Sequence, residues 1–525
     1  MRLATFGLIS AAIVLTASSV RAGDWYVDAV GGSDANSGAT PAQAWRTITK
    51  ALASTRTLQP ERIHVAAGLY DAALGEQFPL WLWEGQALLG AGVGATRLVS
   101  NESGALIVQH YPALPFSEFT ANTYVQALSI SATHTPLWVS SSWGPVRAEF
   151  RDLEVSGGSL RGILVNGTGS SGVGLGIEPV FERVDCHGNN VGLGVGAGDV
   201  VVRDSRLHHN AQAGLQLSTG VLASCRVERT RLDSNGVWGL DVQANFWSPA
   251  AWGHVELEAD GCEIAGNGGG ARLLVESPQQ AGADSRLTLI QCTVGGNTGE
   301  GVADSGSGCE VTLEECVLAS NGDDLNVLGP HFFPRNCLIE DGDAAGLNGC
   351  FAAAPQFVNP AAGDFRLTWN SPCVDRPGLP AYAGALDVAG RPRSIDGDLD
   401  TQPSRDLGAH EFAPLELRGP AHIGQPLVLE CWGPQGAATT VYFSRHPLQV
   451  APQSTPFGEF WLDPNSFGVF RVTTAGALSP GLVQRSIPNA PALVGQSFSF
   501  QSRCASPNAP NGLAYSNPIA VVIEP

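Results

Sequence analysis

The sequence predicts an all-β protein built around a right-handed parallel β-helix, a solenoid in which the chain winds into stacked coils of short strands. Three observations predict this fold: a line of recurring asparagines, a line of small residues five positions ahead of it, and an aliphatic residue between the two lines. Repeats that keep their corners while varying in length are typical of a solenoid, because each coil buries its apolar side only against its neighbours. The asparagines, 21 to 32 residues apart, are Asn189, Asn210, Asn235, Asn267, Asn297 and Asn321.

The second line supports the same reading. Its members are Ser205, Thr230, Cys262, Cys292 and Cys316, with Cys186 slightly out of step. We expect these small side chains to fill a narrow interior position, with the cysteines as free buried thiols. We also expect the asparagines to occupy a sharp bend in the left-handed conformation and to bond one another from coil to coil.

A leucine-rich repeat is the alternative, because residues 289–297 read L-x-x-C-x-V-x-x-N. That repeat needs a helical or extended leucine-bearing return segment after its asparagine. Residues 211–222 instead alternate and are interrupted by glycine, which predicts strands. Three short strands in a coil of about 22 residues favour the parallel β-helix.

The N-terminus has the pattern of a secretory signal peptide over residues 1–22. Arg2 precedes an apolar stretch, and Val20-Arg21-Ala22 has the form of a cleavage site. No later segment is apolar for long enough to predict a transmembrane helix. Residues 23–110 are predicted to form the N-terminal cap and the first coils. Within them, a short helix with Ile48, Ala51 and Leu52 on one side is expected to cover the open end of the first coil.

Composition excludes some partners. The net charge of −20 and a pI near 4.9 argue against binding to nucleic acid or anionic lipid. Glycine and proline are abundant, at 64 and 34 residues, as many short strands joined by turns require.

Motifs in residues 24–100 carry a family resemblance. They are Trp25-Tyr-Val-Asp28, Gly31-Gly-Ser-Asp34-Ala-Asn36-Ser-Gly38, Ile63-His-Val-Ala-Ala-Gly68-Leu-Tyr70 and Leu88-Leu-Gly90-Ala-Gly92. This region resembles the N-terminal module of unknown function found on exported bacterial β-helix proteins of the pectin-lyase-like superfamily. The resemblance implies a bacterial protein that is secreted or held at the cell surface. Enzymes of this fold are mostly polysaccharide lyases and hydrolases.

The chain is predicted to contain three further regions after its first coils. Asparagine-ladder coils cover residues 146–330, and a closing segment covers 331–413. The closing segment contains Pro355-Gln-Phe357, Ser371-Pro-Cys373-Val-Asp375 and Asp406-Leu-Gly-Ala-His-Glu411. It resembles the end of the bacterial family named choice-of-anchor Q, whose name describes a sorting context. Spaced alternating strands after Pro414 predict a separate antiparallel β-sandwich over residues 414–525.

Eleven cysteines and no C-x-x-C motif argue against a zinc or redox site built from thiols. Cys431 and Cys504 lie on strand-like segments of the C-terminal domain. We expect these two to form a disulfide.

No catalytic site follows from the sequence. A hydrolase needs two carboxylates, but the position two residues after the repeat glycine reads Gln216, Asp241, Leu273 (counted from Ala271) and Ala303. The arginines of the coils are expected to be solvated, and His208-His209 is interpreted as an ordinary exposed turn.

Two motifs are candidate binding sites. Asp396, Asp398 and Asp400 alternate like the start of a Ca²⁺ loop, although the later glutamate of an EF-hand is missing; the alternative is a solvated acidic turn. Phe246, Trp247 and Trp252 lie in a long inserted loop, with Trp238 on the adjoining turn. Sugars stack on such rings, so these four residues form a candidate carbohydrate-binding platform. The alternative is that the rings pack onto the coils as a lid.

These observations lead to one functional hypothesis and two alternatives. The hypothesis is a secreted or cell-surface monomer that binds a polysaccharide or a cell-surface glycan, without an identifiable catalytic site, with Ca²⁺ as its candidate cofactor and no organic cofactor. The first alternative is a polysaccharide lyase or glycoside hydrolase, which depends on fold analogy alone. The second is a structural or adhesive surface protein.

Overall fold

A computed structural model describes residues 23–55, 60–83, 85–109, 123–141, 146–167, 176–219, 223–244, 254–275, 284–306, 308–376 and 385–525. The predicted signal peptide lies outside these ranges, as do Phe246, Trp247 and Trp252. None of the helices in the described ranges is long and apolar enough to cross a membrane.

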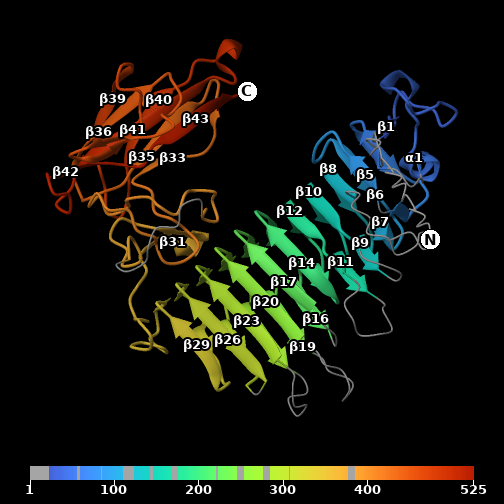
Figure 1. Cartoon of the computed structure of the whole chain (residues 1–525), viewed down its shortest axis with the longest axis horizontal. Helices are drawn as coiled ribbons and strands as arrows, with labels where there is room; N and C mark the ends of the chain where they lie inside the picture. The colour runs from blue at the N-terminus through green and yellow to red at the C-terminus, as the bar shows by residue number, and fades with distance from the viewer. Residues whose placement is uncertain are drawn as a thin grey trace, which may run out of the picture.

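The chain forms the predicted right-handed parallel β-helix (Figure 1). From residue 198 onward a coil contains three strands, as in β14 (Gly198–Arg203), β15 (Arg206–His208) and β16 (Ala213–Thr219). Each strand pairs in parallel with its counterpart on the next coil, so that β14 pairs with β17 and β16 with β19. Aliphatic side chains point inward and form one continuous core along the coils.

Two sheets make up the solenoid. The first sheet contains β1 (Gly23–Val27), β2 (Glu61–Val65), β3 (Gly68–Asp71), β5 (Gln86–Leu89), β6 (Thr96–Val99), β8 (Thr123–Ser131), β10 (Ala148–Ser156), β12 (Val180–His187), β14, β15, β17 (Ala223–Glu228), β18 (Arg231–Asp233), β20 (His254–Asp260), β21 (Glu263–Ala265), β23 (Asp284–Ile290), β24 (Thr293–Gly295), β26 (Cys309–Glu314), β27 (Val317–Ala319), β29 (His331–Arg335) and β30 (Leu338–Ile339). The second sheet contains β4 (Leu80–Trp83), β7 (Gly104–Gln109), β9 (Thr135–Ser141), β11 (Arg161–Gly167), β13 (Val191–Val195), β16, β19 (Trp238–Ala244), β22 (Gly269–Val275), β25 (Glu300–Asp304) and β28 (Asp323–Asn326).

The six asparagines form one hydrogen-bonded line, as predicted. Each Nδ2 donates to the Oδ1 of the next asparagine, over distances of 2.8 to 3.1 Å from Asn189 to Asn321. The expectation that they take the left-handed conformation is wrong. Positive φ falls on the residue before each asparagine, including His209 at +50° and Ser234 at +58°. The preceding residue therefore makes the bend, which leaves the asparagine side chain pointing into the coil.

The line of small residues is also confirmed as interior. The hydroxyl of Ser205 accepts a hydrogen bond from the backbone N–H of Val184, and the thiol of Cys316 donates to the Leu289 carbonyl at 3.3 Å. Cys186 lies off this line and contacts the amide of Asn189. All eleven cysteines are free buried thiols.

The predicted helix caps the first coils. α1 (Ile48–Ser54) begins after Thr47, whose hydroxyl accepts the Lys50 N–H at 3.1 Å, and a short 3₁₀ turn, η1 (Pro41–Gln43), precedes it. The helix buries Ile48, Ala51 and Leu52 against the strands, as the sequence pattern predicted.

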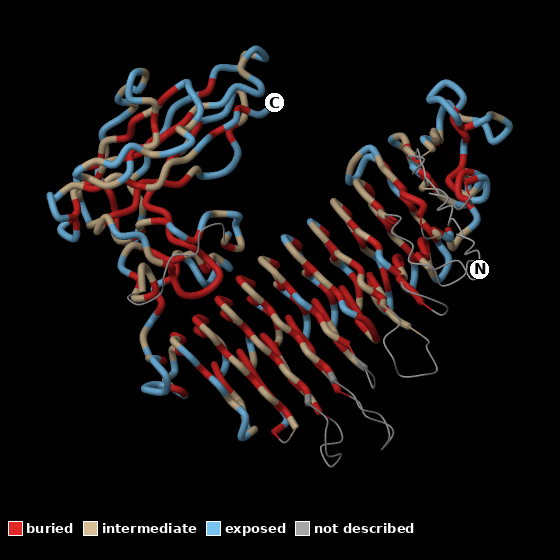
Figure 2. Tube along the Cα trace, in the orientation of Figure 1, coloured by how far each residue is buried: buried red, intermediate tan, exposed pale blue. Residues whose placement is uncertain are grey.

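The closing segment covers the outer face of the later coils rather than extending the stack. It contains β31 (Phe357–Asn359), η2 (Pro360–Ala362) and β32 (Asp364–Leu367). The Phe365 ring packs on β24, where a Cβ at Gly295 would lie 2.8 Å from it. Residues 405–416 are all buried (Figure 2). Buried polar pairs hold this stretch to the coils: Arg405 to Glu315 at 3.0 Å, and His410 to Glu263.

The C-terminal domain follows the closing segment, toward the end of the solenoid away from the N-terminal cap (Figure 1). Its elements are β33 (Leu415–Leu417), β34 (Ala421–His422), β35 (Pro426–Cys431), β36 (Ala438–Ser444), β37 (Gln453–Thr455), β38 (Gly458–Phe460), β39 (Phe467–Thr474), β40 (Gly481–Ser486), η3 (Pro491–Leu493), β41 (Ser497–Ala505), β42 (Leu513–Tyr515) and β43 (Ile519–Glu524). Two largely antiparallel sheets, β33-β35-β40 and β34-β43-β41-β36-β39, enclose an apolar core, as a β-sandwich requires.

The structure does not show the disulfide expected in this domain. Cys431 and Cys504 are separate free thiols. Cys431 ends β35 and packs in the sandwich core, whereas Cys504 lies on the other sheet and belongs to a different apolar cluster. The Cys504 sulfur accepts a hydrogen bond from the Thr439 hydroxyl at 3.2 Å.

Candidate functional site

The outer face of the second sheet carries a row of large apolar side chains on its first coils. Strand register places Trp81, Ile107, Trp138 and Leu164 side by side on β4, β7, β9 and β11. Consecutive coils lie ~4.8 Å apart, so these four residues extend over roughly 15 Å along the solenoid axis. We call Trp81, Trp83 and Trp138, with Ile107 between them, the aromatic stripe.

The alternation of β4 explains the first part of this stripe. Leu80 and Leu82 point inward and are buried, so Trp81 and Trp83 both point outward. Their rings stack with centroids 5.7 Å apart, and Trp81 is 41% exposed. The sequence reasoning missed this pair, although Leu-Trp-Leu-Trp at residues 80–83 is a period-2 signal that places two indoles on one face.

Arg161 lies across the same face where the row continues. Gly194 follows Leu164 in register, and a Cβ there would lie 2.4 Å from the Cδ and Nε atoms of Arg161. The missing side chain at Gly194 thus makes room for the arginine stem. The Arg161 guanidinium has no hydrogen-bond or ion-pair partner among the described residues, and burial lowers its pKa. An unpaired guanidinium beside an apolar stripe is available to an external oxygen ligand.

Further along the row, polar side chains bind one another. Asp241 is 4% exposed, and it accepts hydrogen bonds from Arg272 at 2.8 Å and from Gln243 at 2.6 Å. The structure corrects the sequence register here, because Arg272, not Leu273, lies beside Asp241. A one-residue slip moves a side chain to the opposite face of a strand, so Leu273 belongs to the core. Asp241 is a paired structural carboxylate rather than a free acid or base.

Trp238 begins β19 and is 9% exposed. Its ring lies over Gly269, and the Arg272 guanidinium covers it at 5.0 Å from the ring centroid. Phe246, Trp247 and Trp252 follow β19 in the chain but lie outside the described residues, so their stacking role stays a prediction.

A cavity of about 490 Å³ lies on the other sheet, where residues 388–390 of the closing segment pass over the coils. Four arginines line it, and three of them have carboxylate partners: Arg183 with Asp152, Arg206 with Asp233 and Arg229 with Asp204. The fourth, Arg231, makes no ion pair within the described part of the chain.

The acidic motif gathers in the closing segment with a partner from elsewhere. Carboxylate oxygens of Asp375, Asp396 and Asp398 lie within 4.8 Å of one another, whereas Asp400 is not part of this group. The Asp400 side chain instead accepts the Gln402 N–H at 2.6 Å. Asp375 is 21 positions before Asp396, so alternation within the motif could not reveal it.

Burial sets the ionisation of this acidic cluster, which we define as Asp375, Asp396 and Asp398. Burial and the neighbouring Asp406 raise the pKa of Asp375 to about 8, and burial raises the pKa of Asp396 to about 7. Burial also raises the pKa of Asp398. Backbone N–H groups occupy part of each carboxylate, as at Asp375 Oδ2, which accepts from Asp398 N at 2.6 Å. Free lone pairs remain, and oxygen-only donors of this kind suit Ca²⁺.

Residues 30–114 match a family described as protein of unknown function DUF1565. No curated protein sequence matches the chain. Pectate lyase Pel9A is similar at 17% identity with a TM-score of 0.43, over 75% of this chain and 98% of that one.

Two further solved structures are similar at lower scores. The A-module of mannuronan C-5 epimerase AlgE6 from Azotobacter vinelandii has 15% identity and a TM-score of 0.33, over 59% of this chain and 94% of its own. The enzymatically active domain of tailspike protein 2 of bacteriophage CBA120 has 9% identity and a TM-score of 0.38, over 91% of this chain and 74% of its own. The chain therefore folds as a right-handed parallel β-helix, and its residues 30–114 match the family of unknown function DUF1565.

Proposed function

We propose that this protein binds a polysaccharide or cell-surface glycan along the outer face of its second sheet. The stacked pair of the exposed Trp81 and the half-buried Trp83, with Trp138 in register two coils later, carries this proposal. Indole rings offer flat apolar surface to the C–H faces of sugars. Two coils separate Trp81 from Trp138 by ~10 Å, so one extended chain along the axis can contact both.

Arg161 supplies the polar part of this surface. Its guanidinium can donate several hydrogen bonds in one plane to sugar hydroxyls or to a sugar carboxylate. The chain's charge of −20 opposes long-range attraction of acidic polymers. Arg161 can therefore bind an oxygen group of a glycan at the stripe, while the net charge of the chain keeps the surface as a whole unattractive to polyanions.

Chain order supports a longer surface. Trp143 follows β9, and Phe246, Trp247 and Trp252 follow β19, so the segments that carry them leave strands of the second sheet. Each ring would contribute about 1 kcal/mol, so retention on a polymer needs several of them at once. Trp238, covered by Arg272, would support this surface from beneath.

The proposal also places the protein outside the cell, in agreement with the signal pattern of residues 1–22. In the same proposal, Asp375, Asp396 and Asp398 hold Ca²⁺ and stabilise the closing segment. They lie in that segment rather than on the second sheet, so the ion would act on stability and not on the sugar.

The test is retention of full-length protein on insoluble and gel-embedded polysaccharides, neutral and acidic. A Trp81→Ala/Trp83→Ala variant should lose most of the retention of the wild type on whichever polymer binds it. Phe333→Ala is the matched control, since Phe333 is 50% exposed on β29 of the first sheet. Equal retention of the tryptophan variant and the wild type, or equal loss in Phe333→Ala, would contradict the proposal.

A further inference from the structure

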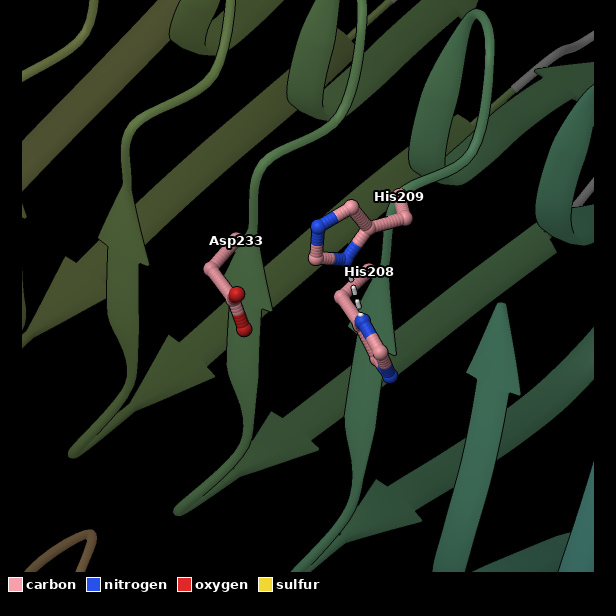
Figure 3. Close-up of side chains that lie close together, drawn as sticks. All are labelled: His208, His209 and Asp233. Atoms are coloured by element: carbon pink, nitrogen blue, oxygen red, sulfur yellow. Dashed lines mark hydrogen bonds between the residues drawn. The ribbon is translucent and has the colours of Figure 1, made fainter. Parts of the chain in front are cut away.

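Two consecutive histidines lie close to an aspartate on the first sheet (Figure 3). The aromatic stripe lies on the second sheet. His208 ends β15, and His209 occupies the left-handed bend immediately before Asn210 of the ladder. Asp233 lies beside His208 in register on β18. The ladder therefore holds the backbone of His209 in a conformation that turns its ring back toward His208.

The potential ligand atoms are close together. The Nδ1 atoms of His208 and His209 are 2.6 Å apart, and one ligand atom of each of the three residues lies within 4.8 Å of the others. At that separation the two Nδ1 atoms cannot both carry a proton, so at least one presents a lone pair.

A second layer of contacts orients these groups. The Nε2 of His208 lies 2.7 Å from the Asp185 carboxylate, which holds the proton on Nε2 and leaves Nδ1 unprotonated. Arg206 binds both oxygens of Asp233, at 2.8 and 2.7 Å, and fixes the position of that carboxylate.

We propose that His208, His209 and Asp233 bind one divalent transition-metal ion of the zinc type. Two imidazole nitrogens and one carboxylate are ligands for Zn²⁺ and its neighbours, whereas Ca²⁺ and Mg²⁺ prefer oxygen alone. A carboxylate that hydrogen-bonds the remote nitrogen of a ligating histidine is a recurrent support of such sites. The proposal does not depend on glycan binding, because its residues lie on the first sheet.

The geometry needs one small movement. Bonds of ~2.0–2.1 Å around a tetrahedral ion place two nitrogen ligands roughly 3.3 Å apart, so the Nδ1 atoms, now 2.6 Å apart, must separate by about 0.7 Å. His208 is held by Asp185, and His209 is exposed, so the His209 ring can make this movement. Its exposure also leaves the fourth position of the ion open to solvent.

The chain offers a matched control. His187 lies beside His208 in register on the preceding coil, with ring centroids 5.2 Å apart, and it contacts Glu154 at 3.3 Å. It is a neighbouring half-buried histidine with a carboxylate partner, but it is not a member of the three-residue group. Loss of His187 should therefore leave metal binding unchanged.

The experiment is titration of the chelator-treated, full-length protein with Zn²⁺ by calorimetry, and with Co²⁺ by visible absorption. We expect one equivalent to bind and the cobalt spectrum to show weak d–d bands without a thiolate charge-transfer band. His209→Asn, which suits the left-handed bend, should weaken binding at least about tenfold, and Asp185→Asn by about 10–100-fold. His187→Asn should bind as the wild type does.

Circular dichroism and melting curves would confirm that each variant is folded. The proposal is overturned if the wild type binds no zinc, if His209→Asn binds as tightly as the wild type, or if His187→Asn loses as much affinity. A strong thiolate band with Co²⁺ would also overturn it, because the metal would then be bound by cysteine.

Discussion

The Nδ2 atom of Asn235 donates to the Oδ1 atom of Asn267 at 2.9 Å, and the backbone N–H of Asn235 donates to the same oxygen at 2.9 Å. Both residues are buried, and the same double contact recurs at every step from Asn189 to Asn321. Each Oδ1 atom thus accepts hydrogen bonds from the side-chain amide and from the backbone N–H of the asparagine on the preceding coil. These paired bonds hold consecutive coils in register.

Replacement of Asn235 by leucine should lower the free energy of unfolding by about 1–3 kcal/mol, because buried donors of Asn210 lose their acceptor. Urea denaturation followed by circular dichroism measures this change. Asn190→Leu is the control, since Asn190 is half-buried and lies outside the ladder. An equal effect of the two substitutions would refute the special role of the ladder.

Glu314 and Glu315 offer a paired test of how the closing segment is held. Glu315 binds the buried Arg405, whereas Glu314 pairs with the exposed Arg335. Glu315→Gln should cost about 3–5 kcal/mol of unfolding free energy, because it removes a negative charge that binds a buried guanidinium. Glu314→Gln should cost no more than about 1 kcal/mol. If the urea midpoints of the two variants coincide, this account is contradicted.

Stability should fall between about pH 5 and pH 8.5. The folded-state pKa values of Asp375 and Glu411, each about 8, and of Asp396, about 7, exceed the values near 4 of an unfolded chain. The folded state therefore binds more protons, so this stabilisation is complete below about pH 4 and is lost as pH rises through 7 to 8.

Urea midpoints measured across this pH range would show the decline, and Asp375→Asn should flatten it. Asp199→Asn, at an exposed aspartate of β14, should leave the slope unchanged. A wild-type midpoint that rises with pH over the same range would reverse the assigned sign.

Added Ca²⁺ should raise the melting temperature, and more so at pH 8 than at pH 5, because it binds the deprotonated carboxylates of the acidic cluster. Asp398→Asn should lose this response. Asp400→Asn should keep it, since the Asp400 carboxylate binds Gln402 N outside the cluster. Wild-type melting curves that do not change with calcium or chelator would show that this segment binds no Ca²⁺.

Local patterns were enough to predict the solenoid, its interior lines and its N-terminal helix. Asparagines such as Asn235 and cysteines such as Cys262 recur at fixed places because every coil passes the same narrow interior corner. One sequence therefore contains the same packing constraint many times. The β-sandwich was predictable for a similar reason, since alternation along strands is a local property.

Relationships between coils were decided by the tertiary structure. No spacing rule brings Asp375 to Asp396, Glu263 to His410 or Phe365 to Gly295, because these contacts depend on where the closing segment returns along the coils. The Arg161 guanidinium and the His208–His209–Asp233 group likewise depend on strand register, in which one residue of slip changes the face of every side chain. The sequence by itself determined the coil and its ladder through repeated local constraints, whereas the sites arose from the packing of one coil or segment against another.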